Sequence, residues 1–510
     1  MAAPVPPSAP VPPSTPPLPS APSPATPPTL PPPSATVPVP PSAPAPAPGH
    51  GYRVVANPMF VPSAPAAGPG PAGPAGGPGP AGPAGLPGGT SRSNSPPSTA
   101  LLAGSPHPGS PASPEAVADF HRRLPGYEAT PLLSLPRLAA RLGVAELLVK
   151  CESRRLGLPA FKMLGASWAT YRALSDHLGA EPGPWSDLDE LAALLRPHLP
   201  LTLTAATDGN HGRAVAAMAR LLGLGARILV PAGTSAGRIA AIASEGAVVE
   251  EVAGGYDDAV AHSATLAGPD CLVVSDTSWP GYTTVPGYVI EGYSTLFAEI
   301  DSALAGAGRR GPEVVVVPIG VGALAAAAAA HYRRPGAAPV GLVGVEPSDA
   351  ACLSESVLAG EPVTLAGPQR SVMVGLNCGT PSLVAWPAVS AGFGTFVSID
   401  DGWALDAVVD LAAAGVEAGE TGAASVAGLA ALLAAGVPAE PAGGSPGASA
   451  GPGGASAGAV WEPAGGSPGP GRGIGPESRV LCLVTEGASD RDAWWRILGA
   501  EALGTPVPGR

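Results

Sequence analysis

Short apolar segments alternate with amphipathic or alanine-rich segments along most of this chain of 510 residues. This alternation limits the possible folds more than any other feature. The apolar segments have the length and β-branched content of buried strands, and those between them have the period of helices. Strands separated by helices form a parallel sheet with helices on both faces, so we expect an α/β fold. The expected strands are 147–150, 201–205, 226–230, 248–252, 272–275, 314–317, 340–345 and 480–485.

Two proline- and glycine-rich tracts interrupt this pattern. Residues 1–114 hold 38 of the 69 prolines, with two arginines as their only formal charges. A segment with so few large apolar residues cannot bury enough surface to offset its conformational entropy, so we expect it to be mostly disordered. Within it, residues 52–60 have ordinary composition and are a candidate N-terminal arm. A second tract, 438–478, predicts a disordered insertion, which leaves 115–437 and 479–510 as the catalytic domain.

The charge of the chain excludes several classes of partner. The formal net charge is −13 without any cluster of Lys and Arg, whereas nucleic acids and anionic membranes require concentrated positive charge. The longest apolar run, 314–330, contains Pro318, Gly320 and Gly322, which predict a strand, a loop and a helix in place of a membrane span. No secretory signal is evident, and the five cysteines lack metal-ligand spacing. We therefore expect a cytoplasmic protein that binds a small molecule and no metal.

Loops after parallel strands carry the ligand sites of such folds, and two of them contain polar residues in unusual settings. Lys162 lies among apolar and small residues, where an ammonium group loses solvation as in a lysine that forms a Schiff base. A surface lysine at a helix start is an equally good reading. Asn210 lies between two glycines that let the backbone approach a ligand, although a helix cap gives the same pattern. We interpret the adjacent His211 as structural.

Two further loops complete the pattern. Gly320 and Gly322 follow the strand 314–317 and precede an alanine-rich helix, whose exposed amides could bind a phosphate. Tight packing of that helix on the sheet would require the same small residues. Thr485 ends the last expected strand, where its hydroxyl could contact a ligand.

Seven motifs occur in a fixed order at or near these loops. They are Ala160-Phe161-Lys162, Thr207-Asp208-Gly209-Asn210-His211-Gly212, Asp276-Thr277-Ser278-Trp279-Pro280-Gly281-Tyr282, Gly344-Val345-Glu346-Pro347, Gly375-Leu376-Asn377-Cys378-Gly379, Gly419-Glu420-Thr421-Gly422 and Thr485-Glu486-Gly487. Together they resemble fold type II pyridoxal-phosphate enzymes and, more narrowly, the diaminopropionate ammonia-lyase family. The resemblance covers about 120–490 except the second tract. It implies a two-lobed α/β fold, with the smaller lobe at about 165–287, and a homodimer.

The resemblance also implies a cofactor, pyridoxal 5′-phosphate, and a role for each site residue. Lys162 would hold the cofactor, Asn210 would bond its phenolic oxygen, and Thr485 would face its pyridine nitrogen. Its phosphate would be bound by the backbone amides of Gly320, Val321, Gly322 and Ala323.

The implied reaction is the α,β-elimination of 2,3-diaminopropionate to pyruvate and two ammonia molecules. The two enantiomers expose the α-proton on opposite faces, so an enzyme that uses both needs two bases. The resemblance implies Asp208 for the D-isomer and Asp276 for the L-isomer, although either aspartate could instead cap a turn. It also places Cys352 and Cys378 near the mouth of the site, where a redox-sensitive bridge is an alternative to two independent thiols.

Two other functions remain open at this stage. A serine/threonine dehydratase or another fold type II lyase would share the fold and the cofactor but would act on a different substrate. A non-catalytic protein with a proline-rich scaffold arm is a more remote alternative, which the presence of both Lys162 and Asn210 disfavours.

Overall fold

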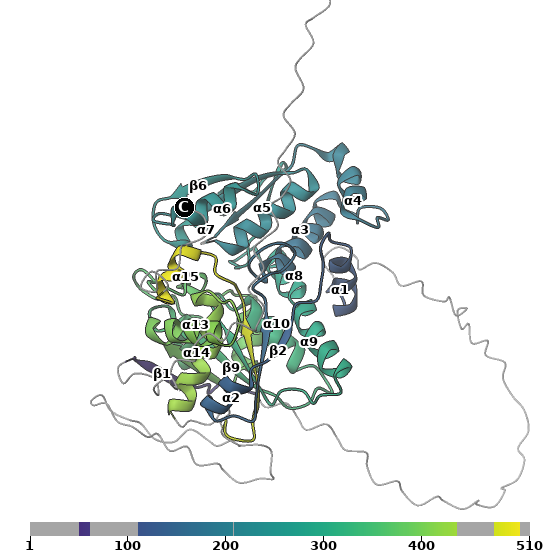
Figure 1. Cartoon of the computed structure of the whole chain (residues 1–510). Helices are drawn as coiled ribbons and strands as arrows, with labels where there is room; N and C mark the ends of the chain where they lie inside the picture. Colours follow the sequence, from purple (N-terminus) through teal and green to yellow (C-terminus); the bar gives the residue numbers. More distant parts are fainter. Residues whose placement is uncertain (1–49, 62–110, 208, 436–473, 500–510) are drawn as a thin grey trace, which may run out of the picture. The chain divides into compact units, whose positions relative to one another are not determined.

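The computed structural model of the protein describes residues 50–61, 111–207, 209–435 and 474–499 (Figure 1). The predicted disorder of most of residues 1–114 and 438–478 falls largely outside these ranges, as does the candidate base Asp208. Within them, strands alternate with helices around parallel-rich sheets, which confirms the predicted α/β class.

The described part of the chain forms the following elements. The strands are β1 (Tyr52–Ala56), β2 (Leu132–Ser134), β3 (Glu146–Cys151), β4 (Thr202–Ala206), β5 (Gly225–Pro231), β6 (Val248–Val252), β7 (Cys271–Val273), β8 (Val314–Pro318), β9 (Gly341–Pro347), β10 (Thr395–Ile399) and β11 (Arg479–Val484). The helices are α1 (Pro114–Arg122), α2 (Pro136–Leu142), α3 (Lys162–Leu178), α4 (Leu188–Leu195), α5 (Asn210–Leu222), α6 (Ala236–Ala243), α7 (Tyr256–Thr265), α8 (Thr284–Gly292), α9 (Ser294–Gly306), α10 (Ala323–Tyr332), α11 (Cys352–Ala359), α12 (Trp386–Gly392), α13 (Asp401–Ala413), α14 (Glu420–Ala435) and α15 (Arg491–Ile497). Short 3₁₀ turns occur at Arg196–His198, Ser348–Ala350 and Val374–Leu376.

The larger sheet has seven strands in the order β1-β10-β9-β8-β11-β3-β2. Its five inner strands, β10, β9, β8, β11 and β3, run parallel. Both edge strands run antiparallel to their neighbours: Tyr52 of β1 lies opposite Ile399 of β10, and Leu132 of β2 lies opposite Lys150 of β3. The candidate arm at 52–60 therefore contributes a strand to this sheet.

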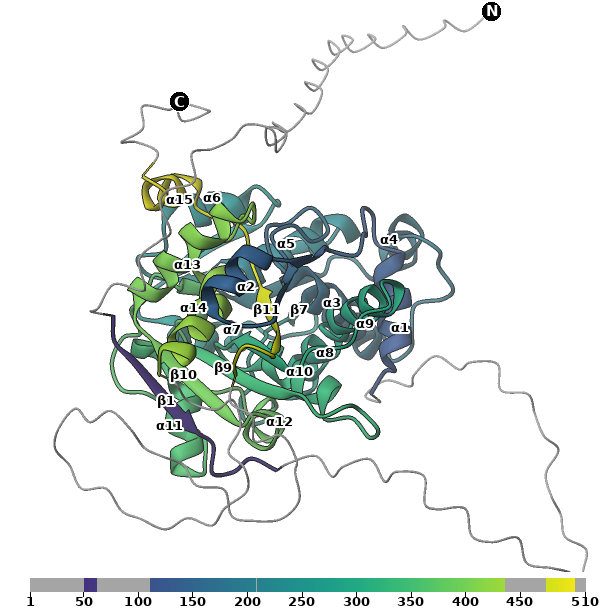
Figure 2. The same ribbon diagram turned by 60° about the horizontal axis from the view of Figure 1, so that its bottom comes forward.

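Both faces of the larger sheet are covered, which explains why its inner strands are apolar at successive positions. In β3, Leu147 and Val149 belong to one hydrophobic cluster and Leu148 belongs to the other. Side chains alternate across a strand, so a sheet with helices on both faces buries every position. Helices α2, α13, α14 and α15 contribute to the cluster on one face, and α8, α9, α10 and α12 contribute to the other (Figures 1 and 2).

The smaller sheet has four parallel strands in the order β6-β5-β4-β7. Leu203 and Ile228 pack with residues of α3 and α5 in the main cluster, whereas Ala206 and Leu229 pack with residues of α7 in a separate one. Helices therefore cover both faces of this sheet as well. The loops that leave its strands lead to two of the candidate site residues, Asn210 after β4 and Asp276 after β7.

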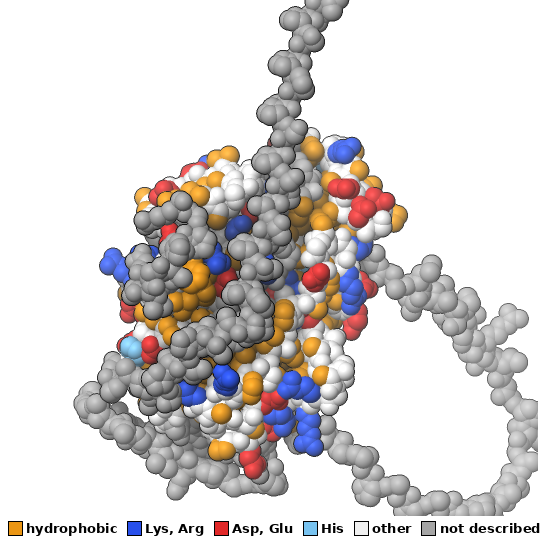
Figure 3. Space-filling model, in the orientation of Figure 1, with side chains coloured by type: hydrophobic (Ala, Val, Ile, Leu, Met, Phe, Trp, Pro, Cys, Tyr) orange, Lys and Arg blue, Asp and Glu red, His pale blue; other side chains and the backbone are white. Residues whose placement is uncertain are grey.

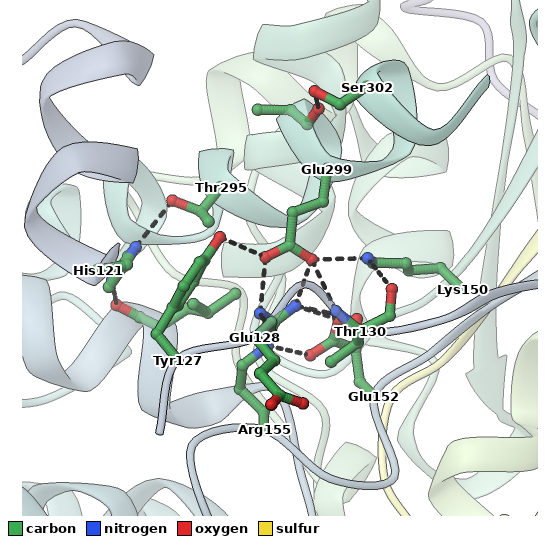
Figure 4. A network of polar contacts seen from close by, with 12 residues as sticks. His121, Tyr127, Glu128, Thr130, Lys150, Glu152, Arg155, Thr295, Glu299 and Ser302 are labelled. Atoms are coloured by element: carbon green, nitrogen blue, oxygen red, sulfur yellow. Dashed lines mark hydrogen bonds and ion pairs between the residues drawn. The ribbon is translucent and has the colours of Figure 1, made fainter. Parts of the chain in front are cut away.

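A buried ionic network joins β3, α9 and the loop that leads to α3 (Figure 4). Glu299 Oε2 lies 2.6 Å from Lys150 Nζ, and Arg155 bridges Glu299 at 2.7 Å and Glu152 at 2.6 Å. These four side chains are at most 6% exposed. Burial alone would raise the pKa of Glu299, but the hydrogen bonds and charges of Arg155 and Lys150 lower it to about 2. The network therefore holds two cations and two carboxylates and fixes the loop before α3.

The apolar run 314–330 is divided between β8 and α10 by the loop that contains Gly320 and Gly322, as the sequence predicts. Within the described ranges, no helix combines the length and the apolar character needed to cross a membrane. On the face shown in Figure 3, basic and acidic side chains lie next to one another at the surface.

Candidate active site

A cavity lies at the carboxyl ends of strands from both sheets. Its walls come from the loops after β4, β7, β8 and β11 and from the start of α3. This is the place where open parallel sheets bind their ligands. All the described residues that the sequence assigns to the site line the cavity, namely Lys162, Asn210, Asp276, Gly320, Val321, Gly322, Ala323 and Thr485.

Lys162 is the first residue of α3 and points toward a carboxylate across the cavity. Its Nζ donates to Asp276 Oδ2 at 2.6 Å, and the lysine side chain is 20% exposed. An ammonium group at the positive end of a helix dipole is unfavourable, so the carboxylate compensates for the position of the lysine. The local sequence suggests a wholly apolar environment for Lys162, and this is wrong because Asp276 arrives from a distant loop.

Asp276 is held by the loop after β7. The Tyr282 hydroxyl donates to the Val273 carbonyl at 2.7 Å and accepts from the Ser275 amide at 3.2 Å, which closes this loop. The Tyr256 hydroxyl donates to Asp276 Oδ1 at 3.2 Å. Burial raises the pKa of Asp276, but the neighbouring His211 and Lys162 and the Tyr256 hydroxyl outweigh burial and hold the pKa below its usual range. The carboxylate is therefore ionised at neutral pH.

His211 occupies a buried position behind Asp276. Its Nε2 lies 2.8 Å from the Val274 carbonyl and must carry the proton of that hydrogen bond. Its Nδ1 lies 3.8 Å from Asp276 Oδ2 and has no hydrogen-bond partner among the described residues. Burial lowers the pKa of His211, so the ring is neutral at pH 7. This geometry supports the interpretation of His211 as a structural residue.

The glycine loop between β8 and α10 forms a backbone-lined wall of the cavity. A Cβ at Gly320 would lie 3.1 Å from Cys378 Sγ and 3.2 Å from the Gly375 carbonyl oxygen, so a larger residue would crowd the loop. Gly322 caps α10 with a φ of +102°, which side-chain-bearing residues rarely adopt. Among the described residues, the amides from Gly320 to Ala323 have no backbone carbonyl partner. They face the cavity at the positive end of α10.

Two polar side chains that line the cavity, one at the start of α5 and one just after β11, contact each other. The Asn210 side-chain Nδ2 donates to Glu486 Oε2. Thr485, beside it, is 3% exposed, and its Oγ1 has no hydrogen-bond partner within the described residues. A buried hydroxyl without a partner usually indicates a missing ligand atom or water.

The two candidate cysteines both lie beside Gly320. Cys352 Sγ is 4.0 Å from the Gly320 carbonyl oxygen, and Cys378 Sγ lies 3.1 Å from the position that a Gly320 Cβ would take. Both carry thiols in this structure. Burial raises the pKa of the Cys352 thiol well above its ordinary value, which disfavours the reactive thiolate. The redox-sensitive bridge therefore stays a prediction.

Comparisons with known proteins agree with this geometry. Residues 123–441 match the model of a family described as pyridoxal-phosphate dependent enzyme. The chain is 35% identical over 294 residues to a diaminopropionate ammonia-lyase of Salmonella typhimurium, which covers 56% of this chain and 72% of the relative. It is 36% identical over 287 residues to the diaminopropionate ammonia-lyase of Escherichia coli strain K12, which covers 55% and 70%.

A solved structure gives the same result. The crystal structure of the selenomethionine-containing holo diaminopropionate ammonia lyase from Escherichia coli is similar with a TM-score of 0.65 and 26% identity, over 89% of this chain and 97% of that chain. This chain belongs to the diaminopropionate ammonia-lyase family of pyridoxal-phosphate dependent enzymes. The fold type II class that the sequence predicts is therefore confirmed.

The cofactor of this family is compatible with the cavity. The amides from Gly320 to Ala323 lie at a helix N-terminus without backbone carbonyl partners among the described residues, which suits a phosphate group. The unpartnered hydroxyl of Thr485 can bond a ring nitrogen. The Lys162 amine lies in the same cavity and can react with an aldehyde. The residues present thus suit the phosphate, the ring and the aldehyde of pyridoxal phosphate.

Four polar residues that line the cavity were not predicted from the sequence. They are Arg238, Tyr256, Thr421 and Glu486. Thr421 and Glu486 belong to motifs that the sequence identifies, and that membership was the available signal. Nothing local distinguishes Arg238 and Tyr256, which reach the cavity from the starts of α6 and α7.

Proposed function

We propose that this chain converts 2,3-diaminopropionate into pyruvate and two molecules of ammonia. The observation that carries the proposal is the Lys162 amine, 2.6 Å from a buried carboxylate and in one cavity with a glycine loop at a helix N-terminus. A reactive amine, a base and a phosphate cradle are the groups that a pyridoxal-phosphate lyase requires. The diaminopropionate ammonia-lyases that the chain resembles support the choice of substrate.

Pyridoxal phosphate, when bound, supplies an electron sink for the electron pair left at the α-carbon. Lys162 would hold the cofactor through Nζ and give it up to the substrate amine. Asp276 would accept the α-proton of the L-isomer, because its carboxylate is ionised and lies beside Lys162. By the family resemblance, Asp208 would accept the α-proton of the D-isomer.

The bond changes balance without a further reactant except water. The Cα–H and Cβ–N bonds break, a Cα–Cβ double bond forms, and the β-amine leaves as ammonia. Water then hydrolyses the released enamine to pyruvate and the second ammonia. No oxidant or reductant takes part.

Two residues would tune the cofactor. Asn210 would donate to its phenolic oxygen, and the Thr485 hydroxyl would face its pyridine nitrogen. A neutral hydroxyl, unlike a carboxylate, leaves that nitrogen less fully protonated and the ring a weaker electron sink. A weaker sink suits β-elimination, which passes the electron pair on to the leaving group.

The test is to measure products from the purified full-length chain with pyridoxal phosphate. Diaminopropionate is expected to give one pyruvate for two ammonia, and Lys162→Ala is expected to abolish turnover. Faster release of one ammonia from serine or threonine would identify a dehydratase instead. A chain that binds no cofactor would indicate a non-catalytic scaffold.

We further propose that the enzyme acts as a homodimer in the cytoplasm. This rests on the resemblance of the chain to the diaminopropionate ammonia-lyases. Light scattering coupled to size exclusion would give the mass of the assembly, and a mass of one chain would contradict the dimer.

A further inference from the structure

Glu486 is a buried carboxyl group with a defined set of partners at the cavity wall. The residue is 4% exposed, and its carboxyl receives the Asn210 Nδ2 hydrogen bond. The Thr421 hydroxyl also bonds this carboxyl, and Arg238 contributes a favourable charge. Burial raises the pKa of Glu486. Burying a carboxyl group is costly unless each of its oxygens is paired, so its presence here needs an explanation.

The direction of the hydrogen bonds around Glu486 is fixed. The Gly375 amide donates to Thr421 Oγ1 at 3.2 Å, so the Thr421 hydroxyl hydrogen is available for the Glu486 carboxyl. Asn210 donates from its other side. Glu486 is therefore an acceptor from both neighbours, which requires the NH₂ end of the Asn210 amide to face it. The second hydrogen of that NH₂ group remains for another acceptor.

The backbone of residue 486 is held on three sides, so the carboxyl group cannot move away easily. Glu486 forms an antiparallel bridge with Ala160, two residues before Lys162. Its carbonyl oxygen accepts from the Gly419 amide at 3.2 Å. A Cβ at Gly422 would overlap this carbonyl oxygen, so the start of α14 lies directly against it. Glu486 thus connects the loops of Lys162, Asn210 and Thr421.

We propose that Glu486 is a positioning residue, whose carboxylate orients the Asn210 amide so that its NH₂ group donates to the phenolic oxygen of the cofactor. Without an acceptor at 486, the amide could turn over and present its oxygen to that phenolic oxygen. The hydrogen bond would then become a repulsion between two acceptors. This inference rests on the proposed function only in that the cavity binds pyridoxal phosphate.

A double-mutant cycle on cofactor binding tests the proposal. The full-length chain is compared with Glu486→Met, Asn210→Ala and the double variant. The measured quantities are the dissociation constant of pyridoxal phosphate and the pH midpoint of the visible absorption of the bound cofactor. Loss of one oriented hydrogen bond is expected to weaken binding by about 10-fold in each single variant, and the double variant is expected to be no weaker than Asn210→Ala alone.

Two further variants separate positioning from a general structural effect. Glu486→Gln keeps an acceptor oxygen for Asn210, and its NH₂ group can donate to Thr421 Oγ1 in place of the bond that Glu486 accepts from Thr421. Its affinity for pyridoxal phosphate is therefore expected to stay within about threefold of the wild type. Glu417→Met changes a nearby carboxylate that pairs with Arg491 at 3.3 Å and does not line the cavity. It is expected to leave both measured quantities unchanged.

The outcomes are distinguishable. If Glu486→Met weakens pyridoxal phosphate binding by the same factor in the wild-type and Asn210→Ala backgrounds, the positioning role is wrong. Glu486 would then act independently of Asn210. A non-additive cycle in a chain that does not convert diaminopropionate would support the positioning role and contradict the proposed substrate. A wild-type chain that binds no pyridoxal phosphate would overturn both.

Discussion

Asp276 depends on its neighbours for the charge that a base needs. The residue is 4% exposed, and burial alone would favour its neutral form. Lys162 at 2.6 Å and Tyr256 at 3.2 Å favour the carboxylate instead. The base strength of Asp276 therefore depends on the charge of Lys162, and loss of that charge would raise the pKa of the carboxyl group.

The two candidate bases predict a difference between substrate enantiomers. Asp276→Asn is expected to lower kcat/KM for L-diaminopropionate by about 100-fold or more and to affect the D-isomer much less. Asp208→Asn is expected to show the reverse preference. Pyruvate release from each pure enantiomer measures both. If each substitution lowers the two rates by the same factor, the aspartates are positioning or folding residues.

His121 predicts a loss of stability in mild acid. Its ring is buried between Thr295 Oγ1 at 2.7 Å and the Leu164 carbonyl at 2.9 Å. Burial lowers its pKa to about 3, whereas the ordinary value is about 6.5. The unfolded chain therefore binds a proton first, and stability that is complete above pH 6.5 falls as the pH drops toward 3, by up to about 1.4 kcal/mol per pH unit.

The measurement for this histidine is the thermal unfolding midpoint between pH 8 and pH 5. The unfolding midpoint of the wild-type chain is expected to decrease as the pH is lowered below 6.5. His121→Gln keeps polar atoms at this position but cannot titrate, so its midpoint is expected to vary less over the same range. Parallel pH profiles for the two proteins would show that His121 does not cause the acid sensitivity.

At the scale of elements, a single substitution in the ionic network between β3 and α9 is expected to lower the free energy of unfolding strongly. Glu299→Gln removes the charge that faces both Lys150 and Arg155. Arg155 keeps Glu152, but Lys150 is left as a buried cation without its carboxylate partner, which is expected to cost about 3–5 kcal/mol. The matched change Glu417→Gln affects a partly exposed pair and is expected to cost under about 1 kcal/mol. Denaturant unfolding compares them, and similar costs would contradict the importance of burial.

Most strands could be predicted from the sequence because both faces of the sheets are covered. Continuous apolar segments such as those in 314–317 and 480–485 correspond closely to β8 and β11. The prediction missed β2 and β10. β2 has only three residues and depends on pairing with β3. β10 carries Thr395 and Ser398 among three apolar residues, without a clear period, yet all five residues are buried and the strand lies between two neighbours.

The sequence predicts which residues lie at the site but not which of their side chains contact one another. Lys162, Asn210 and Thr485 each come after a predicted strand, so parallel topology predicts that they meet at one edge. Which side chains then touch depends on packing between distant segments. The contacts of Lys162 with Asp276 and of Asn210 with Glu486 are of this kind.

At the scale of the whole molecule, the arm at 52–60 predicts two different effects of shortening the chain. Deleting residues 1–49 is expected to leave activity and the unfolding midpoint unchanged, because a Pro/Ala/Ser sequence has too few large apolar side chains to bury much surface. A chain that begins at Val61 is expected to have an unfolding midpoint about 4 °C or more below that of the full-length chain. That chain loses the β1 pairing and the buried Asn57, whose Nδ2 donates to the Ser390 and Phe393 carbonyls at 2.6 Å. Equal midpoints would show that the arm does not stabilise the fold.

The antiparallel strand β1 also determines what the sheet presents to other molecules. With β1 in place, the backbone groups of β10 are paired on both sides. Without it, the fully buried strand Thr395–Ile399 would become an open edge of five residues with unpaired amides and carbonyls. Such an edge is a template for a strand from another copy of the chain. We therefore expect the arm to prevent aggregation through β10. Light scattering of the shortened chain is expected to rise with protein concentration well below its unfolding temperature.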